Sequence, residues 1–122
     1  MEHATSRPSS EPRLLLDAVD GDVAVFRGLV PLFLQETVDR YADIVRFSEA
    51  GRFADMGQEA HALKGTAITI GATVLVQLLQ QIEEGGLRRR IPCSVAQRSR
   101  LSELLQLARE DMESFLGTLP PA

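Results

Sequence analysis

Apolar side chains recur every three or four residues over most of this chain, and this spacing favours helices. The clearest case covers residues 52–70, whose apolar residues follow one another in steps of three and four: Phe53, Met56, Ala60, Leu63, Ala67 and Ile70. Residues at this spacing share one face of an α-helix. No segment shows the strict apolar and polar alternation, flanked by turn residues, that marks a β-hairpin. The pattern predicts an all-α protein.

The same pattern places five helices, which we expect at about 13–19, 23–49, 52–70, 72–84 and 95–118. Four long amphipathic helices with short connections are typical of an antiparallel four-helix bundle with up-down-up-down topology. The short additional N-terminal helix would cover one end. The expected inward residues of the last two helices are leucines and a few other apolar residues: Leu75, Leu78, Leu79, Ile82, Leu101, Leu104, Leu105, Ala108, Met112, Phe115 and Leu119.

Local signals support these boundaries. Asp22 is a good N-cap for the second helix, and residues 94–97 form a capping box. Pro31 predicts a kink or a local break one turn before it. The pair Gly85-Gly86 is expected to stop the fourth helix.

Residues 1–12, with the sequence MEHATSRPSSEP, have no periodic apolar pattern and predict a flexible N-terminal tail. Residues 13–119 then form one domain, which agrees with a length of 122 residues.

Composition narrows the function. The net charge is −4, which argues against a nucleic-acid partner. No apolar run approaches the length of a membrane span, and no secretory signal is visible, so we expect a cytoplasmic protein without a membrane contact. The single cysteine, Cys93, and the two histidines, His3 and His61, exclude a metal site built from several such residues. No phosphate-binding glycine loop and no nucleophile elbow occurs.

His61 stands out. At 100° per residue it lies roughly 130–140° around the helix from the centre of the apolar stripe, so we expect it to be exposed. An exposed histidine is most often an ordinary surface residue, but its neighbours are unusual. Lys64, one turn on, is the only lysine of the chain, and Ile68 follows on the same face. Gly57 and Gly65 flank His61 although a glycine costs a helix about 1 kcal/mol relative to alanine. We expect both glycines to leave room for a partner, rather than to relieve crowding against a neighbouring helix.

An accessible neutral imidazole is a competent nucleophile at neutral pH. A cation one turn away can stabilise a phosphoryl group during or after its transfer. No catalytic base, metal ligand or nucleotide site accompanies His61, so a partner must supply the rest of the chemistry.

Residues 60–83, AHALKGTAITIGATVLVQLLQQIE, resemble the histidine-containing phosphotransfer (HPt) domains of multistep phosphorelays. The family motif reads A-H-x-L-K-G-[SA]-A, followed by a glycine ten residues after the histidine and by a leucine-rich helix. Gly71 and Leu75 stand at the last two features. Thr66 replaces the usual serine and keeps a hydroxyl group. The motif covers 24 residues, and the order and lengths of the expected helices also fit the family.

The resemblance implies roles for four residues. His61 would accept a phosphoryl group on its outward Nε2 from a receiver-domain aspartate and pass it to another receiver. Lys64 would help to neutralise the phosphate, and Gly65 would leave room for the active site of the receiver. Glu83, 22 residues after His61, matches a position that hydrogen-bonds the other imidazole nitrogen. The alternative for Glu83 is a solvated residue at a helix end.

The resemblance also implies the partners. We expect receiver domains of response regulators, a hybrid sensor histidine kinase, or both, to dock near Gly57, Gln58 and Ile68. Magnesium and the aspartyl chemistry would belong to the receiver, so we expect no cofactor and no metal on this chain, and we expect a monomer.

Two other classes of protein are alternatives to a phosphocarrier that is not itself an enzyme. The dimerisation helices of a histidine kinase usually carry an acidic residue directly after the histidine, where this chain has Ala62. A kinase would also need an ATP-binding domain, which 122 residues do not hold. The other alternative is a non-phosphorylated helical adaptor that binds a receiver or a kinase. Its mark would be loss of the histidine or the lysine, and both are present.

Overall fold

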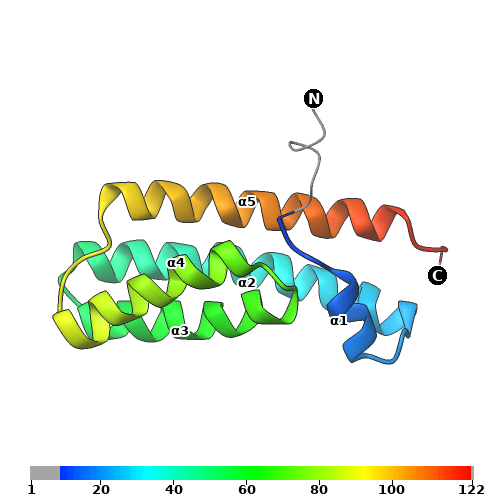
Figure 1. Ribbon diagram of the computed structural model, residues 1–122, viewed down its shortest axis with the longest axis horizontal. Coiled ribbons are helices and arrows are strands. Elements are labelled where there is room, and N and C mark those ends of the chain that lie inside the picture. The colour runs from blue at the N-terminus through cyan, green and yellow to red at the C-terminus, as the bar shows by residue number, and fades with distance from the viewer. Residues whose placement is uncertain (1–8, 122) are drawn as a thin grey trace.

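The computed structural model describes residues 9–121 (Figure 1). Those residues form five α-helices and a π-helical turn, and no strand. The elements are α1 (Arg13–Ala18), α2 (Val23–Glu49), α3 (Phe53–Thr69), α4 (Thr73–Glu84), η2 (Gly85–Arg89) and α5 (Val95–Gly117). The all-α prediction is confirmed, and the observed helix ends lie within one residue of the expected ones.

Helices α2 to α5 form the predicted bundle. Each helix packs against the next one in the chain, and α5 closes the bundle against α2. The short α1 lies at the end of the bundle where α2 begins and α5 ends (Figure 1). None of the helices in residues 9–121 has a stretch long and apolar enough to cross a membrane.

The apolar stripes meet in one aliphatic core. In α3, the expected inward residues from Met56 to Ala67 are buried, and so is Ile70 directly after the helix. The inward positions predicted for α4 are also buried, and so are those of α5 from Leu101 to Met112. Phe115 and Leu119, predicted on the same side, are only half-buried against the core. Near the α1 end, the rings of Phe26 and Phe115 pack edge to face with centroids 5.5 Å apart. This core fixes the rotation of α3 and therefore decides which of its residues face outward.

The helix caps follow the sequence signals. The Asp22 side chain accepts a hydrogen bond from the backbone N–H of Val25, 3.1 Å away. Ser94 and Gln97 exchange the two hydrogen bonds of a capping box at the start of α5. Gly71, with φ +64°, makes the turn between α3 and α4 in the left-handed region that glycine tolerates best.

Helix α2 runs through Pro31 without an interruption, so the predicted local break is wrong. Pro31 is exposed. The carbonyl group that loses its hydrogen bond to the missing N–H lies on the same side of the helix, where water can replace the donor.

Helix α4 ends at Glu84, directly before Gly85-Gly86 as predicted, but the loop expected after the pair begins as a π-helical turn. This turn, η2, ends at Arg90 in a left-handed conformation with φ +55°. Gly86 is buried, and a Cβ added there would collide with the backbone oxygen of Phe53. Gly86 therefore also permits a close approach between η2 and the start of α3.

The predicted tail also needs correction at its C-terminal end. One carboxylate oxygen of Asp111, on α5, accepts hydrogen bonds of 2.8 Å from the backbone N–H and hydroxyl of Ser9 and from the hydroxyl of Ser10. The backbone N–H of Glu11 donates to the carbonyl oxygen of Ile70 at 2.5 Å. Residues 9–12 thus tie α5 to the turn between α3 and α4. Residues 1–8, including His3, lie outside the described residues.

Candidate functional site

His61 lies near the middle of α3 and faces outward. Its side chain is 67% exposed, while its neighbour Ala60 is fully buried. The opposite face of α3 packs against the core, so the imidazole of His61 remains accessible, as the apolar spacing predicted.

Glu83 reaches this imidazole from α4. Its Oε2 lies 2.9 Å from Nδ1 of His61, and its Oε1 lies 2.8 Å from Nζ of Lys64. The Glu83 side chain is only 15% exposed. The alternative of a solvated residue at a helix end is therefore wrong, and the geometry brings together His61, Lys64 and Glu83.

The charge state of Glu83 determines which tautomer the His61 imidazole adopts. Burial raises the pKa of its carboxyl group, but the hydrogen bonds and positive charges of Lys64 and His61 outweigh it, so the pKa is lower than that of an ordinary glutamate. An ionised carboxylate only accepts hydrogen bonds. Nδ1 must then carry the proton, and in the neutral ring Nε2 keeps its lone pair and points away from Glu83. The site thus presents a nucleophilic nitrogen to a partner.

Gln80 also belongs to this network, although it was not among the site residues predicted from the sequence. Its Oε1 accepts a hydrogen bond from Nζ of Lys64 at 2.6 Å, and its Nε2 donates to Oε2 of Glu84 at 3.3 Å. Gln80 lies one turn before Glu83 on α4. The only available signal was this spacing of three residues, because helix positions three apart share a face.

The two glycines that flank His61 have different surroundings. A Cβ added at Gly65 would meet nothing within 4 Å, so this surface is bare as predicted. Gly57 is buried, and an added Cβ would lie 2.8 Å from Cγ of Leu87 and 3.1 Å from the carbonyl oxygen of Glu83. The prediction of Gly57 as a docking residue is wrong, because η2 covers it. The expectation that Gly57 does not relieve crowding is wrong for the same reason.

Gln58 and Ile68 are exposed on α3, and the Ile68 side chain keeps 58% of its surface accessible. Both remain available to a partner that covers His61.

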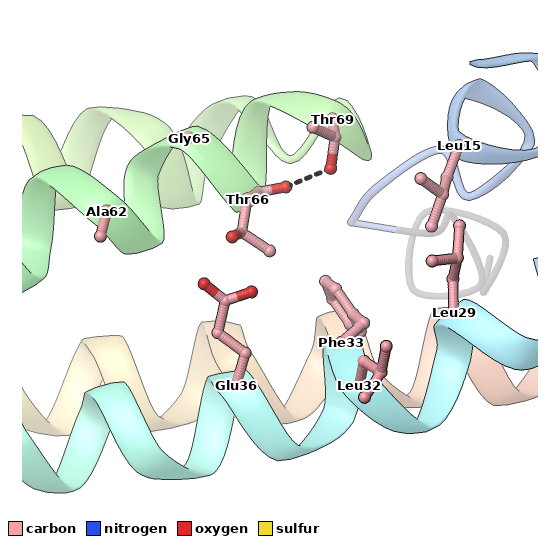
Figure 2. Close-up of a pocket in the computed structure, with 9 residues that line it drawn as sticks. All are labelled: Leu15, Leu29, Leu32, Phe33, Glu36, Ala62, Gly65, Thr66 and Thr69. Carbon is pink, nitrogen blue, oxygen red and sulfur yellow. Dashed lines mark hydrogen bonds between the residues drawn. The ribbon is translucent and has the colours of Figure 1, made fainter. Parts of the chain in front are cut away.

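An open groove of about 390 Å³ begins beside Gly65 and runs between α3, α2 and α1 (Figure 2). Its wall from α1 and α2 is mainly apolar, and the Glu36 carboxylate points from α2 toward α3. The α3 side is small and polar, with Thr66 and Thr69 joined by a hydrogen bond of 2.6 Å. The remaining lining residues are Leu15, Leu29, Leu32, Phe33 and Ala62.

Among residues 9–121, no three or more histidine, cysteine, aspartate or glutamate side chains gather in a group that could hold a metal ion.

Comparison with known protein families gives one match. The family model described as the Hpt domain matches residues 28–111, which include all of α3, α4 and η2 and most of α2 and α5. The comparison with curated proteins found no match, and the comparison with solved structures found none either. Hpt domains are phosphocarrier modules that take part in histidine phosphotransfer in two-component signalling and interact with receiver domains. With more than half of its length matched, the chain belongs to the Hpt domain family.

Proposed function

We propose that His61 is the phosphorylated residue of a phosphorelay intermediate. It accepts a phosphoryl group on Nε2 from the aspartyl phosphate of one receiver domain and passes it to an aspartate of another. The observation that carries this proposal is the contact of 2.9 Å between Nδ1 of His61 and Oε2 of Glu83. It supports a ring whose other nitrogen is unprotonated and exposed.

The transfer is a direct displacement at phosphorus. The lone pair of Nε2 forms the N–P bond while the P–O bond to the receiver aspartate breaks, and the bonding pair leaves with the aspartate carboxylate. Nδ1 keeps its proton, so the ring of the phosphorylated histidine carries a positive charge. The carboxylate of Glu83 faces this charge and stabilises it. The second transfer runs the same exchange in reverse toward another aspartate, without ATP.

The surroundings of His61 support a large partner. Gly65 leaves the surface open next to the imidazole, and the groove starts at this residue. Exposed apolar side chains border the same face, with Leu32 66% exposed on α2 and Ile68 on α3. A receiver that covers His61 would bury these residues, together with the more peripheral Gln58.

The receiver supplies the aspartate and any metal ion that the reaction needs, so this chain acts as a carrier. We further propose that it works as a monomer in the cytoplasm, with response-regulator receivers or a hybrid sensor histidine kinase as its partners.

Phosphotransfer from a receiver charged with a small-molecule phosphodonor tests the proposal. The wild-type protein should take up a label that is labile in acid and stable in base, and His61→Gln should take up none. His3→Gln is the matched control, because it removes the other histidine of the chain and should leave labelling intact.

The His61→Gln variant should unfold at the same denaturant concentration as the wild type, since the side chain is 67% exposed. Label on His61→Gln would place the phosphoryl group elsewhere. No label on the wild type with several receivers would favour the adaptor alternative.

A further inference from the structure

We propose that Gln80 is a positioning residue of this site. It holds Lys64 against Glu83, and through that carboxylate it keeps the imidazole of His61 in the tautomer with a free Nε2. The inference deepens the proposed function and rests on it for the meaning of the site, but its first test needs no phosphoryl group.

The contacts form a continuous chain across α3 and α4. Gln80 accepts from Lys64 at 2.6 Å, Lys64 lies 2.8 Å from Oε1 of Glu83, and Oε2 of Glu83 lies 2.9 Å from Nδ1 of His61. The members alternate between the two helices, with His61 and Lys64 on α3 and Gln80 and Glu83 on α4. Each contact therefore fixes the position of the next side chain across the interface.

The amide of Gln80 has one orientation that satisfies both of its neighbours. Its carbonyl oxygen faces the ammonium of Lys64, and its NH₂ group faces the carboxylate of Glu84 at 3.3 Å. Reversing the amide would set a donor against a cation and an acceptor against an anion. Glu84 therefore holds the Gln80 carbonyl oxygen toward Lys64.

Lys64 needs such an anchor. A lysine side chain is long and flexible, and ordering it costs conformational entropy. Here the side chain is only 17% exposed and its ammonium contacts acceptors from two residues of α4. Before any phosphate arrives, the cation is thus committed to Glu83 and Gln80. At this stage Lys64 acts on His61 only through the Glu83 carboxylate. This role is distinct from direct neutralisation of a bound phosphoryl group.

The tautomer of His61 gives a direct readout. In a His3→Gln background the chain has one histidine, whose two ring nitrogens can be distinguished by ¹⁵N NMR at a pH where the ring is neutral. The parent should show a protonated Nδ1 and an unprotonated Nε2. Gln80→Met keeps the side-chain length and removes the acceptor, and it should increase the population with the proton on Nε2.

Phosphotransfer supplies the second readout. Loss of one hydrogen bond from the chain predicts a rate of transfer about two- to tenfold lower for Gln80→Met. Gln77→Met is the matched control, because Gln77 is exposed on the same helix. It should change neither the tautomer nor the rate. In a Glu83→Ala background, Gln80→Met should have no further effect on the tautomer.

An unchanged tautomer and rate in Gln80→Met would overturn the inference. So would a tautomer shift that persists in full when Glu83 is already absent, because the effect would then bypass the carboxylate. If Lys64→Met slowed transfer without moving the tautomer, Lys64 would act on the phosphate alone, and the positioning role would be refuted. Failure of the wild type to accept a label would instead overturn the proposed function, since the tautomer is measured without a partner.

Discussion

Alanine at Gly57 and alanine at Gly65 are the same chemical change on the same helix, one turn before and one turn after His61. Both residues lie inside α3, so both substitutions gain the helix propensity of alanine over glycine, about 1 kcal/mol. This gain cancels when the two variants are compared. Their difference in unfolding free energy then reports only what each new methyl group contacts.

The structure predicts that Gly65→Ala is the more stable of the two variants. At Gly65 the methyl group meets no atom within 4 Å, so Gly65→Ala should stabilise the protein by up to about 1 kcal/mol. At Gly57 it would lie 2.8 Å from Cγ of Leu87 and 3.1 Å from the carbonyl oxygen of Glu83. Overpacking of this kind costs about 1–3 kcal/mol. After the propensity gain, Gly57→Ala should range from neutral to about 2 kcal/mol less stable than the wild type.

Urea unfolding followed by circular dichroism measures both values. The two midpoints should differ in the stated direction while the slope of the transition stays constant, which shows that the compactness of the end states has not changed. If Gly57→Ala were as stable as Gly65→Ala, or more stable, η2 would not lie against α3 at this point. The assignment of Gly57 to the helix interface would then be wrong.

Three further outcomes follow from the fold. The lowered pKa of Glu83 means that its ionised form stabilises the folded state. The wild type should therefore be more stable than Glu83→Gln by a constant amount near neutral pH. This difference in unfolding free energy should shrink in acid, as the pH falls through the pKa of Glu83 in the folded state. Asp111→Ala removes the acceptor of the buried Ser10 hydroxyl and should lower the unfolding free energy by about 1–3 kcal/mol in urea titrations. Ser94→Ala removes the N-cap of α5 and should cost about 1 kcal/mol, seen as a lower thermal midpoint.

Most of the fold could be predicted because one physical signal dominates it. Apolar residues spaced three and four positions apart identify each helix. Because each helix must bury its apolar face, four such helices can pack together in only a few ways. Residues 9–12 carry no such period, so the sequence could not show that Ser10 is buried against Asp111. That contact joins positions 101 residues apart and depends on the finished bundle.

The site was predictable to the extent that it depends on α3 alone. The helical rotation gave the exposure of His61, and the family motif supplied Glu83. Rotation about one helix axis does not tell where a neighbouring helix runs, so Gly57 and Gly65 looked equivalent. The neighbour of Gly57 is η2, whose π-helical geometry keeps the chain beside α3 after the Gly85-Gly86 pair.

The contact of Gly57 with the backbone of Glu83 links the fold to the chemistry. An added Cβ at Gly57 would press on the carbonyl oxygen of Glu83, and this same residue must place its carboxylate 2.9 Å from the imidazole of His61. Gly57→Ala should therefore disturb the tautomer of His61 in the unphosphorylated protein. Gly65→Ala should leave the tautomer unchanged and slow transfer only when a receiver must approach the ring.

The His61 tautomer and the rate of phosphotransfer, measured in Gly57→Ala and Gly65→Ala, distinguish two effects. One is a change in the spacing between α3 and α4, and the other is a loss of access to the surface beside His61. A tautomer shift in Gly65→Ala, or none in a folded Gly57→Ala, would contradict this division. The division has a physical basis, because a side chain as short as glutamate bridges two helices only where their backbones approach closely. The absence of a side chain at Gly57 permits that approach at one turn of α3, whereas the absence at Gly65 keeps the outer surface free.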